Sequence, residues 1–300
     1  MCGIVGLFLK DDSLAPQFGS YLAPMLGTMS ERGPDSAGFA VYGDRVQGHQ
    51  KISLYSLDQS EEVDDLDSVL SGVAGAPVTS VKHDNHTILS VPTEGMDAVM
   101  SWLAEANGNF EVAGSGARVE VYKAVGLPTE VVKRLDLAHM SGTHGIGHSR
   151  MATESAVTVS GAHPFSTGPD QCLVHNGSLS NHNALRRTLM HDGFTFKTEN
   201  DSEVAAAYLT WRMRQGLSLG EALEASLADL DGFFTFVVST ENGFGVLRDP
   251  IACKPAVMAE TDAYVAFGSE YRALIHLPKI KEARVWEPDP AHVYFWERGQ

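Results

Sequence analysis

The second residue of the chain could carry out nucleophilic chemistry. Cys2 follows Met1 directly and is small enough for that methionine to be removed, which would leave one residue with both a thiol and a free α-amino group. An unperturbed thiol titrates near ~8.5 and an α-amine near ~8, so the amine can accept the thiol proton close to neutral pH. Nucleophile and base then share one residue, and no separate histidine is needed. If Met1 is retained, the amine becomes an amide and this base is lost.

Three other segments offer groups that could bind a polar amide. Arg150 emerges where a predicted strand runs into a loop, and the strand from Gln171 ends in Asn176-Gly177. An Asn-Gly pair places a side-chain amide beside a backbone N–H, which an oxyanion requires, but it is equally typical of an ordinary hairpin turn. Asp201 offers a carboxylate, although it or Ser202 could simply cap the helix that follows, through Trp211.

The histidines and the other cysteines indicate no metal site. His83 and His86 flank a turn and His144 and His148 share one strand face, each pair without a third ligand in register, so we expect a solvated hairpin and strand packing. The three cysteines, at positions 2, 172 and 253, are too few and too widely spaced for a disulfide framework or a four-cysteine cluster. We therefore expect reduced thiols and no metal.

Composition narrows the class of protein. A net charge of −16 argues against sequence-independent nucleic-acid binding, which depends on clustered Lys and Arg. No apolar run approaches the ~18 residues of a membrane span, and no signal peptide is evident, so a cytoplasmic location without a membrane is expected. The sequence also lacks a Gly-rich phosphate loop and a dinucleotide fingerprint, so we expect no FMN, iron–sulfur cluster or ATP in this chain.

The elements that must position these groups follow from hydrophobic periodicity. A buried strand over 4–9 would hold Cys2 inside the fold, and an amphipathic helix over 16–29 would pack on it. Gly43-Asp44 predicts a hairpin turn after a strand at 39–42. Later segments predict helices at 181–190, 201–211 and 219–230, strands at 233–238, 243–247 and 264–267, and a last helix opening at 268–270. Two sheets with helices outside them make an α+β layered fold.

Residues 57–138 differ in character and predict an inserted α+β subdomain. A helix is expected over 95–106, with hairpin turns at 84–85 and 114–116. The segment from Asp58 to Asp67 is acidic, so it is either a docking surface or a solvated decoration. The remainder, 2–56 and 139–300, forms the main domain.

Together the motifs resemble the class II glutamine amidotransferase domain of the N-terminal-nucleophile hydrolase superfamily. They are Met-Cys-Gly-Ile-Val-Gly at 1–6, Arg-Gly-Pro-Asp-Ser-Ala-Gly at 32–38, Gly-His-Ser-Arg-Met-Ala-Thr at 147–153, His-Asn-Gly at 175–177, Asn-Asp-Ser-Glu at 200–203, Arg-Asp-Pro with Lys-Pro at 248–255 and Gly-Ser-Glu at 268–270. The resemblance implies a four-layer αββα sandwich that hydrolyses L-glutamine.

The resemblance also implies roles for single residues. Cys2 would be the nucleophile, Asn176 and Gly177 the oxyanion hole, and Arg150, Thr153 and Asp201 the substrate-binding residues. The stretch 142–155 and the insertion resemble stand-alone subunits related to glutamate synthase, among them the small subunit of N-methylglutamate synthase. That likeness implies a hetero-oligomer with a flavin-containing, synthase-like subunit that carries the FMN and iron–sulfur clusters.

Two other functions stay open at this point. The chain could be a non-catalytic glutamine-binding or scaffold subunit, in which Met1 is never removed. It could also be an N-terminal-cysteine hydrolase of a different amide, whose substrate would not need both Arg150 and Asp201.

Overall fold

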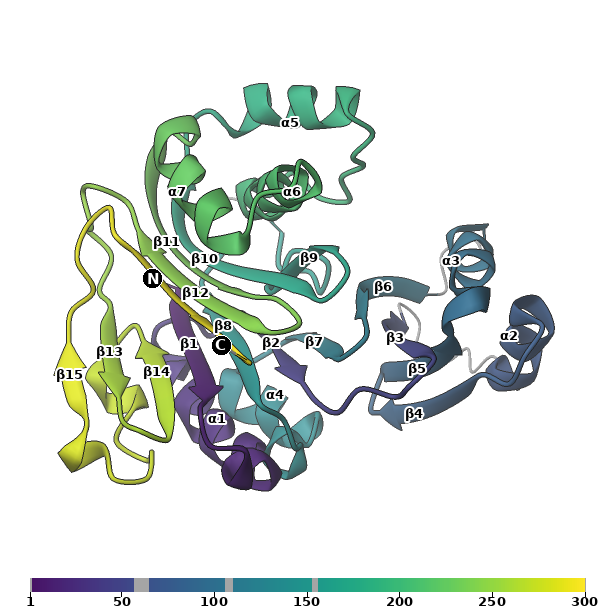
Figure 1. The fold of residues 1–300 in the computed structure, drawn as a ribbon, viewed down its shortest axis with the longest axis horizontal. Helices are drawn as coiled ribbons and strands as arrows, with labels where there is room; N and C mark the ends of the chain where they lie inside the picture. Colours follow the sequence, from purple (N-terminus) through teal and green to yellow (C-terminus); the bar gives the residue numbers. More distant parts are fainter. Residues whose placement is uncertain (1, 57–64, 106–109, 153–155, 300) are drawn as a thin grey trace.

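A computed structural model describes residues 2–56, 65–105, 110–152 and 156–299. Its core is two antiparallel sheets packed face to face, with helices on both outer sides (Figure 1). These four layers are the αββα sandwich of the N-terminal-nucleophile hydrolase fold that the resemblance implied. None of the described helices is long and apolar enough to cross a membrane.

The larger sheet has seven strands in the order β15-β13-β14-β1-β8-β2-β7. Their bounds are β1 Gly3–Leu9, β2 Ser36–Tyr42, β7 Val119–Val125, β8 His144–Arg150, β13 Val257–Glu260, β14 Tyr264–Gly268 and β15 Arg284–Trp286. The first strand lies in the middle of this sheet, paired with β14 on one side and β8 on the other. Its side chains are apolar on both faces, which suits a strand that is covered on both sides. The predicted strand at 4–9 is confirmed.

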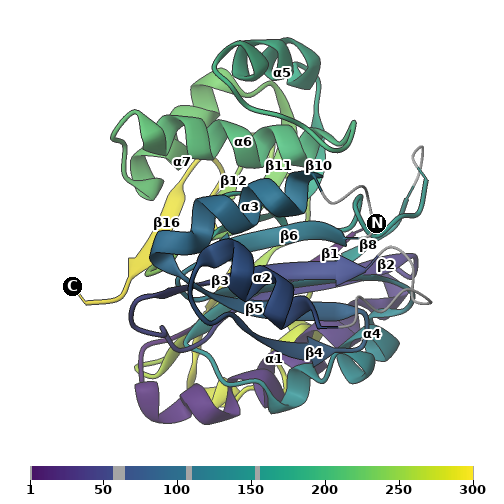
Figure 2. The ribbon, with the colours of Figure 1, turned by 90° about the vertical axis from the view of Figure 1, so that its right-hand side faces the viewer.

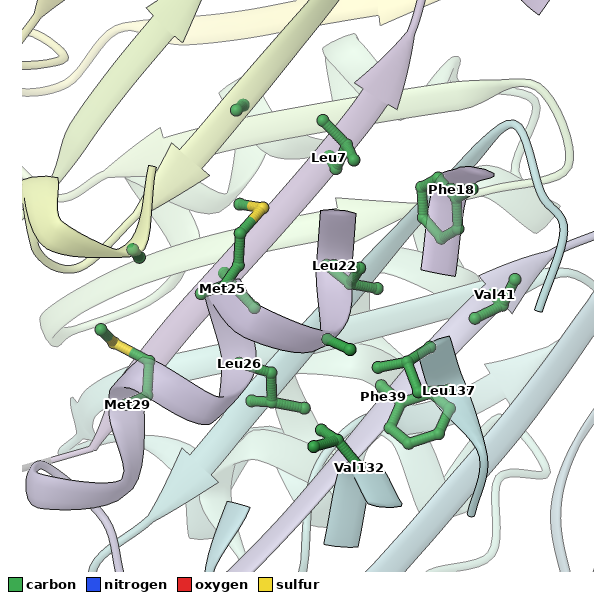
Figure 3. Close-up of a cluster of buried hydrophobic side chains, with 14 of the residues drawn as sticks. Leu7, Phe18, Leu22, Met25, Leu26, Met29, Phe39, Val41, Val132 and Leu137 are labelled. Carbon is green, nitrogen blue, oxygen red and sulfur yellow. The ribbon is translucent and has the colours of Figure 1, made fainter. Parts of the chain in front are cut away.

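Helices α1 (Phe18–Gly27) and α4 (Pro128–Arg134) cover the outer face of this sheet. The segment predicted as one helix over 16–29 is three pieces, with 3-10 turns at Asp12–Gln17 and Thr28–Glu31 on either side of α1. Figure 3 shows Leu22, Met25 and Leu26 of this helix lying over Leu7 of β1 and Phe39 of β2. Burial of this apolar face fixes the helix against the strand that carries Cys2.

The second sheet has five strands in the order β16-β12-β11-β10-β9. They are β9 Phe165–Gly168, β10 Gln171–Leu179, β11 Gly232–Ser239, β12 Gly243–Arg248 and β16 Val293–Glu297. Its outer face packs on α5 (His182–His191), α6 (Asp201–Arg214) and α7 (Leu219–Asp229). The helices and the hairpin predicted for this half are confirmed, and α6 is buried along most of its length because α5 and α7 flank it.

A separate four-stranded sheet, in the order β4-β5-β3-β6, stands beside the sandwich (Figures 1 and 2). Its strands are β3 His49–Ser56, β4 Thr79–His83, β5 His86–Pro92 and β6 Phe110–Gly116, and its helices are α2 Leu66–Ala74 and α3 Met96–Glu105. These elements share a small core of their own. The predicted helix at 95–106 and the turn at 84–85 are confirmed.

The extent of this unit differs from the boundaries 57 and 138. The separate sheet starts earlier, because β3 is its central strand, and it ends at Gly116, because β7 pairs along its length with β2 in the main sheet. For the same reason Gly43-Asp44 is no hairpin turn: β2 and β3 belong to different sheets. The triplet 114–116 lies within β6, and most of the acidic run, 57–64, lies outside the described residues.

The chain end also departs from expectation. Among the described residues after Gly268, the helical segments are 3-10 turns at Tyr271–Ala273 and Ile280–Glu282 and no α-helix forms, so the predicted last helix is wrong. Ser269 explains the difference, because it is tied to the first strand: its backbone N–H donates to the Ile4 carbonyl, and its Oγ accepts from the Ile4 N–H, both at 2.9 Å. That bonding keeps the segment extended where a helix would start.

Candidate active site

Cys2 lies at the edge of the sandwich, immediately before β1, and is half-buried. Its backbone carbonyl accepts two hydrogen bonds from distant parts of the chain, one from Arg32 Nε at 3.1 Å and one from Asn176 Nδ2 at 3.3 Å. Its Sγ lies 3.9 Å from the carbonyl oxygen of Met151. Strand β10 of the second sheet and two connecting segments next to the first sheet therefore converge on this one residue.

Close packing holds the start of the strand in place. A Cβ on Gly3 would lie 2.8 Å from both Met29 Sδ and Ser149 Oγ, so only glycine fits at this position. Together with the two bonds between Ile4 and Ser269, this contact leaves the residues after Cys2 little room to shift. The first strand is buried as the sequence predicted, and it holds the backbone that follows Cys2 in place.

Asn176 and Gly177 lie within β10 and form no turn. They pair with Thr235 and Phe234 of β11, and the ladder runs on to Leu179. The local turn preference of Asn-Gly is overridden by this pairing, so the hairpin interpretation is wrong. Asn176 belongs to the strand face whose earlier residues, Cys172 and Val174, line the space between the sheets, and it points toward Cys2.

Gly177 is required by the crowding around it. A Cβ at this position would approach the Phe233 carbonyl oxygen to 2.0 Å and His175 Nε2 to 2.7 Å. Backbone cannot retreat as a flexible side chain can, so any larger residue would displace β10 or β11. Asn176 and Gly177 are therefore both set rigidly next to Cys2.

The turn at 32–35 organises the other side of the site. Arg32 reaches the Cys2 carbonyl, and the Asp35 carboxylate accepts a hydrogen bond from the Ala152 N–H at 2.7 Å. The Asp35 N–H in turn donates to the Arg150 carbonyl at 3.1 Å. This turn thereby fixes the end of β8, and Arg32 is a site residue that the sequence assignment missed. Its motif was visible, but nothing in one sequence says that its side chain meets residue 2.

Arg150 ends β8 and is buried, with 6% of its surface exposed. Its Nη1 donates to the Ala156 carbonyl at 3.3 Å, and Gly161 packs against the guanidinium, where a Cβ would lie 3.1 Å from Nη1. Ala156 and Gly161 therefore lie against this arginine. Thr153, also expected to bind substrate, lies outside the described residues.

Asp201 is the first residue of α6 but does not cap it. The N-cap is Asn200, whose side chain accepts from the Ser202 N–H at 2.9 Å, so the capping interpretation of Asp201 is wrong. Instead Asp201 Oδ2 accepts from the Leu179 N–H of β10 at 2.8 Å, and Oδ1 lies 3.8 Å from His175 Nδ1. The carboxylate remains one-fifth exposed. It thus links the helix start to the strand that carries Asn176.

Three imidazoles fill the interior behind these residues. His148 and His163 stack with ring centroids 3.9 Å apart, His148 Nε2 donates to the His175 carbonyl at 3.1 Å, and His175 Nδ1 bonds with Ser202 Oγ at 2.8 Å. Burial lowers the pKa of His148 to about 3 and that of His175 to about 4, and it lowers the pKa of His163 well below its usual value. All three rings are therefore neutral at pH 7.

Two further buried histidines, His144 and His86, make structural contacts. His144 stacks on Tyr42 and bonds to the Thr240 carbonyl. His86 is fully buried and accepts from the Lys123 N–H at 3.0 Å, so the expectation of a solvated hairpin fails for it: it joins the small sheet to β7. Within the described parts of the chain, no group of three or more His, Cys, Asp or Glu residues could hold a metal ion.

Comparison with known proteins gives one consistent result. A glutamine amidotransferase domain model matches residues 148–276. The glutamine amidotransferase-like protein GlxB of Rhizobium meliloti (strain 1021) is 59% identical over 297 residues, which are 99% of this chain and 98% of that protein. The match covers both sheets and the separate unit, so the likeness extends to the whole described fold.

Two solved structures share the fold. The glutamine phosphoribosylpyrophosphate amidotransferase from B. subtilis, complexed with ADP and GMP, aligns with a TM-score of 0.62 at 20% identity, and the allosteric regulatory enzyme of purine biosynthesis aligns with a TM-score of 0.63 at 21%. Each alignment covers 99% of this chain and 47% of the other, so the chain corresponds to about half of each. At this identity the likeness concerns the fold alone.

Proposed function

The chain belongs to the glutamine amidotransferase family, and from that premise we propose that Cys2 attacks the side-chain amide of L-glutamine and that the chain releases glutamate and ammonia. The observation that carries the proposal is the meeting of Asn176 and Arg32 on the carbonyl of Cys2. Asn176 comes from β10 and Arg32 from the turn before β2, and both converge on the one residue that can be both nucleophile and base.

The chemistry proceeds in two halves. Once Met1 has been removed, the α-amine of Cys2 takes the thiol proton, and the sulfur attacks the amide carbon of the substrate. The amine then returns a proton to the leaving nitrogen, the C–N bond breaks, ammonia departs and a thioester remains. Water, activated by the same amine, hydrolyses the thioester to glutamate and restores the thiol.

The tetrahedral intermediate of each half carries a negative oxygen. We assign its stabilisation to Asn176 Nδ2 and the Gly177 N–H. Two features support this assignment: Asn176 Nδ2 already lies within hydrogen-bond distance of Cys2, and the packing around Gly177 keeps its backbone from moving. Donors held in place before the reaction need no reorganisation when the charge develops, which is why such a site accelerates catalysis.

The two ends of the amino acid call for opposite charges. We assign the substrate carboxylate to Arg150, and keep Thr153 as a substrate-binding residue from the sequence motif, because a guanidinium binds a carboxylate through two parallel hydrogen bonds. We assign the substrate ammonium to Asp201, whose carboxylate is fixed to β10 and remains partly exposed. A pair of such charges selects an amino acid over a simple amide.

We further propose that the ammonia passes to a flavin-containing, glutamate-synthase-like subunit of the N-methylglutamate synthase type. The FMN and iron–sulfur clusters would reside on that subunit, and the complex would be a cytoplasmic hetero-oligomer. The support is the sequence likeness of the 142–155 stretch and of the insertion to such stand-alone subunits. Co-purification from the native source tests it, and the absence of any flavoprotein in repeated preparations would contradict it.

The glutaminase proposal is tested by Cys2→Ala. We expect no glutamine hydrolysis and an unchanged unfolding temperature, because only the sulfur is removed. Cys253→Ser, which alters an exposed thiol, is the matched control and should keep full activity. Hydrolysis by Cys2→Ala near the wild-type rate would refute the nucleophile. The intact mass of the protein distinguishes the glutaminase from a non-catalytic scaffold subunit, which predicts retention of Met1. A preference for a simple acyl amide over glutamine would favour the hydrolase of a different amide.

A further inference from the structure

A line of alternating charges leads from the protein surface to Cys2. Glu31 pairs with Arg272 at 2.6 Å, Arg272 with Glu270 at 2.5 Å, and Glu270 with Arg32 at 2.7 Å. Arg32 then donates from Nε to the carbonyl of Cys2. Four charged side chains from two distant segments, 31–32 and 270–272, thus end on the backbone of the residue that carries the thiol.

The inner ion pair of this line, between Arg32 and Glu270, is the one with the stronger electrostatic interaction. The exposed fraction of the side chains falls from 78% at Glu31 and 39% at Arg272 to 29% at Glu270 and 9% at Arg32. Water and salt screen the outer pair, whereas the Arg32–Glu270 pair is shielded and holds its geometry. Burial alone would raise the pKa of Glu270, but the hydrogen bond from Arg32 and the charge of Arg272 hold it below its usual value.

The backbone fixes Glu270 on the same strand pair that fixes Cys2. Its neighbour Ser269 exchanges two hydrogen bonds with Ile4, so Glu270 directly follows a residue that is tethered to β1. The backbone at Glu270 is extended, so the predicted helix does not start there. This conformation directs the Glu270 carboxylate toward Arg32.

We propose that Glu270 is a positioning residue for the nucleophile: it holds Arg32 on the Cys2 carbonyl and balances the charge of the guanidinium beside the thiol and the α-amine. This inference rests on the proposed function. Glu270 acts through Arg32, and its ion pairs among the described residues are with Arg32 and Arg272.

The charged groups around Cys2 determine in which direction its pH dependence should move when Glu270 is replaced. The charged groups on the elements around Cys2 include Arg32, Glu270, Arg272 and Glu31, and also Asp35, whose carboxylate is bonded to the Ala152 N–H. Arg150 at the end of β8 and Asp201, which is bonded to β10, belong to the same surroundings and are unchanged in the variants. Removing the negative charge of Glu270 leaves two guanidinium groups with less compensation. A more positive surrounding favours a thiolate over a thiol and a neutral amine over an ammonium, so the nucleophile should become active at lower pH.

The test separates charge from position with three substitutions. Glu270→Gln keeps an oxygen that can accept from Arg32 but removes the charge, Glu270→Ala removes both, and Glu270→Asp restores the charge. Glu260→Gln is the matched control, because Glu260 pairs with Lys10 at the opposite end of β1 and is similarly exposed. The readouts are the pH dependence of kcat/KM for glutamine and the rate at which iodoacetamide alkylates Cys2, followed on the N-terminal peptide in a Cys253→Ser background.

For Glu270→Gln we expect both profiles to move to lower pH by about half a unit or more, and for Glu270→Asp and Glu260→Gln we expect wild-type profiles. For Glu270→Ala we expect kcat to fall about tenfold with little change in KM, since the lost interaction acts on the nucleophile and not on the substrate. Profiles for Glu270→Gln that coincide with those of Glu260→Gln would overturn the inference. Alkylation needs no turnover, so this result is distinguishable from failure of the proposed function, which an inactive wild-type enzyme would reveal.

Discussion

The substitution Asp201→Asn isolates one charge. Asp201 Oδ2 accepts from the Leu179 N–H and Oδ1 accepts from Ser202 Oγ at 3.3 Å. An asparagine can keep its oxygen toward Leu179 and turn its NH₂ toward Ser202 Oγ, whose own proton is then available for His175 Nδ1. The local hydrogen bonds therefore survive, and only the negative charge offered to the substrate ammonium is lost.

The size of the effect follows from that loss. A hydrogen bond to a charged group contributes about 1.5–3 kcal/mol, and each ~1.4 kcal/mol is a factor of ten, so the KM for glutamine should rise about ten- to hundredfold. The unfolding temperature should hardly change, because Asn200 and not Asp201 caps α6. Steady-state glutaminase kinetics and thermal unfolding measure the two quantities on the same preparation.

Asn200→Ala is the matched control, since it removes the cap and leaves the carboxylate. It should cost about 1 kcal/mol of stability and leave KM unchanged. An unchanged KM for Asp201→Asn together with a lowered unfolding temperature would refute the reasoning, because the carboxylate would then serve only the joint between α6 and β10.

Three further substitutions extend the test. Arg150→Lys should raise KM strongly, because an ammonium replaces a planar fork; kinetics unchanged within error would make Arg150 purely structural. Asn176→Ala should lower kcat by about 10²–10³, corresponding to about 2.7–4 kcal/mol for one oxyanion donor, and a smaller loss would point to another donor. The buried histidines should make the protein acid-sensitive: their pKa values lie below the ordinary ~6.5 in the folded state, so the unfolded chain binds protons first as pH falls. Each should cost about 2 kcal/mol of stability between pH 7 and pH 5. Urea unfolding at both pH values measures this loss, and it should shrink for His163→Phe; an equal loss in the variant would mean that His163 does not titrate in this range.

The sequence predicts the layers of this fold well, for a physical reason. The strands and helices of both sheets are long, periodic segments whose buried faces can be recognised locally. Three short features were misjudged, because pairing partners far along the chain decide them. Asn176-Gly177 has a local preference for a turn that the ladder with β11 overrides, Gly43 joins two sheets and not one hairpin, and Ser269 is held extended by Ile4.

The residues of the candidate site likewise fall into those that the sequence indicates and those that only the structure reveals. Cys2, Asn176 and Asp201 could be nominated from their residue types and their motifs, and the structure brings Asn176 against Cys2. Arg32 and Glu270 could not be nominated, because their importance lies in contacts that span 30 and 238 residues of chain. A single sequence does not show which residues far apart in the chain make contact. It also does not show that Asn200, and not Asp201, is the N-cap of α6.

The pairing of β1 has a consequence for how the protein folds during its synthesis. The first strand pairs with His144–Ser149 on one side and with Tyr264–Gly268 on the other, so Cys2, the proposed nucleophile, gains these surroundings only after residue 268 has been made. Contacts of such long sequence separation close slowly, and a ribosome-bound or prematurely terminated chain carries the thiol without the groups that direct it. Under the proposed function, an incomplete chain that lacks 264–268 would therefore carry Cys2 without one of the two strands that hold β1 in place.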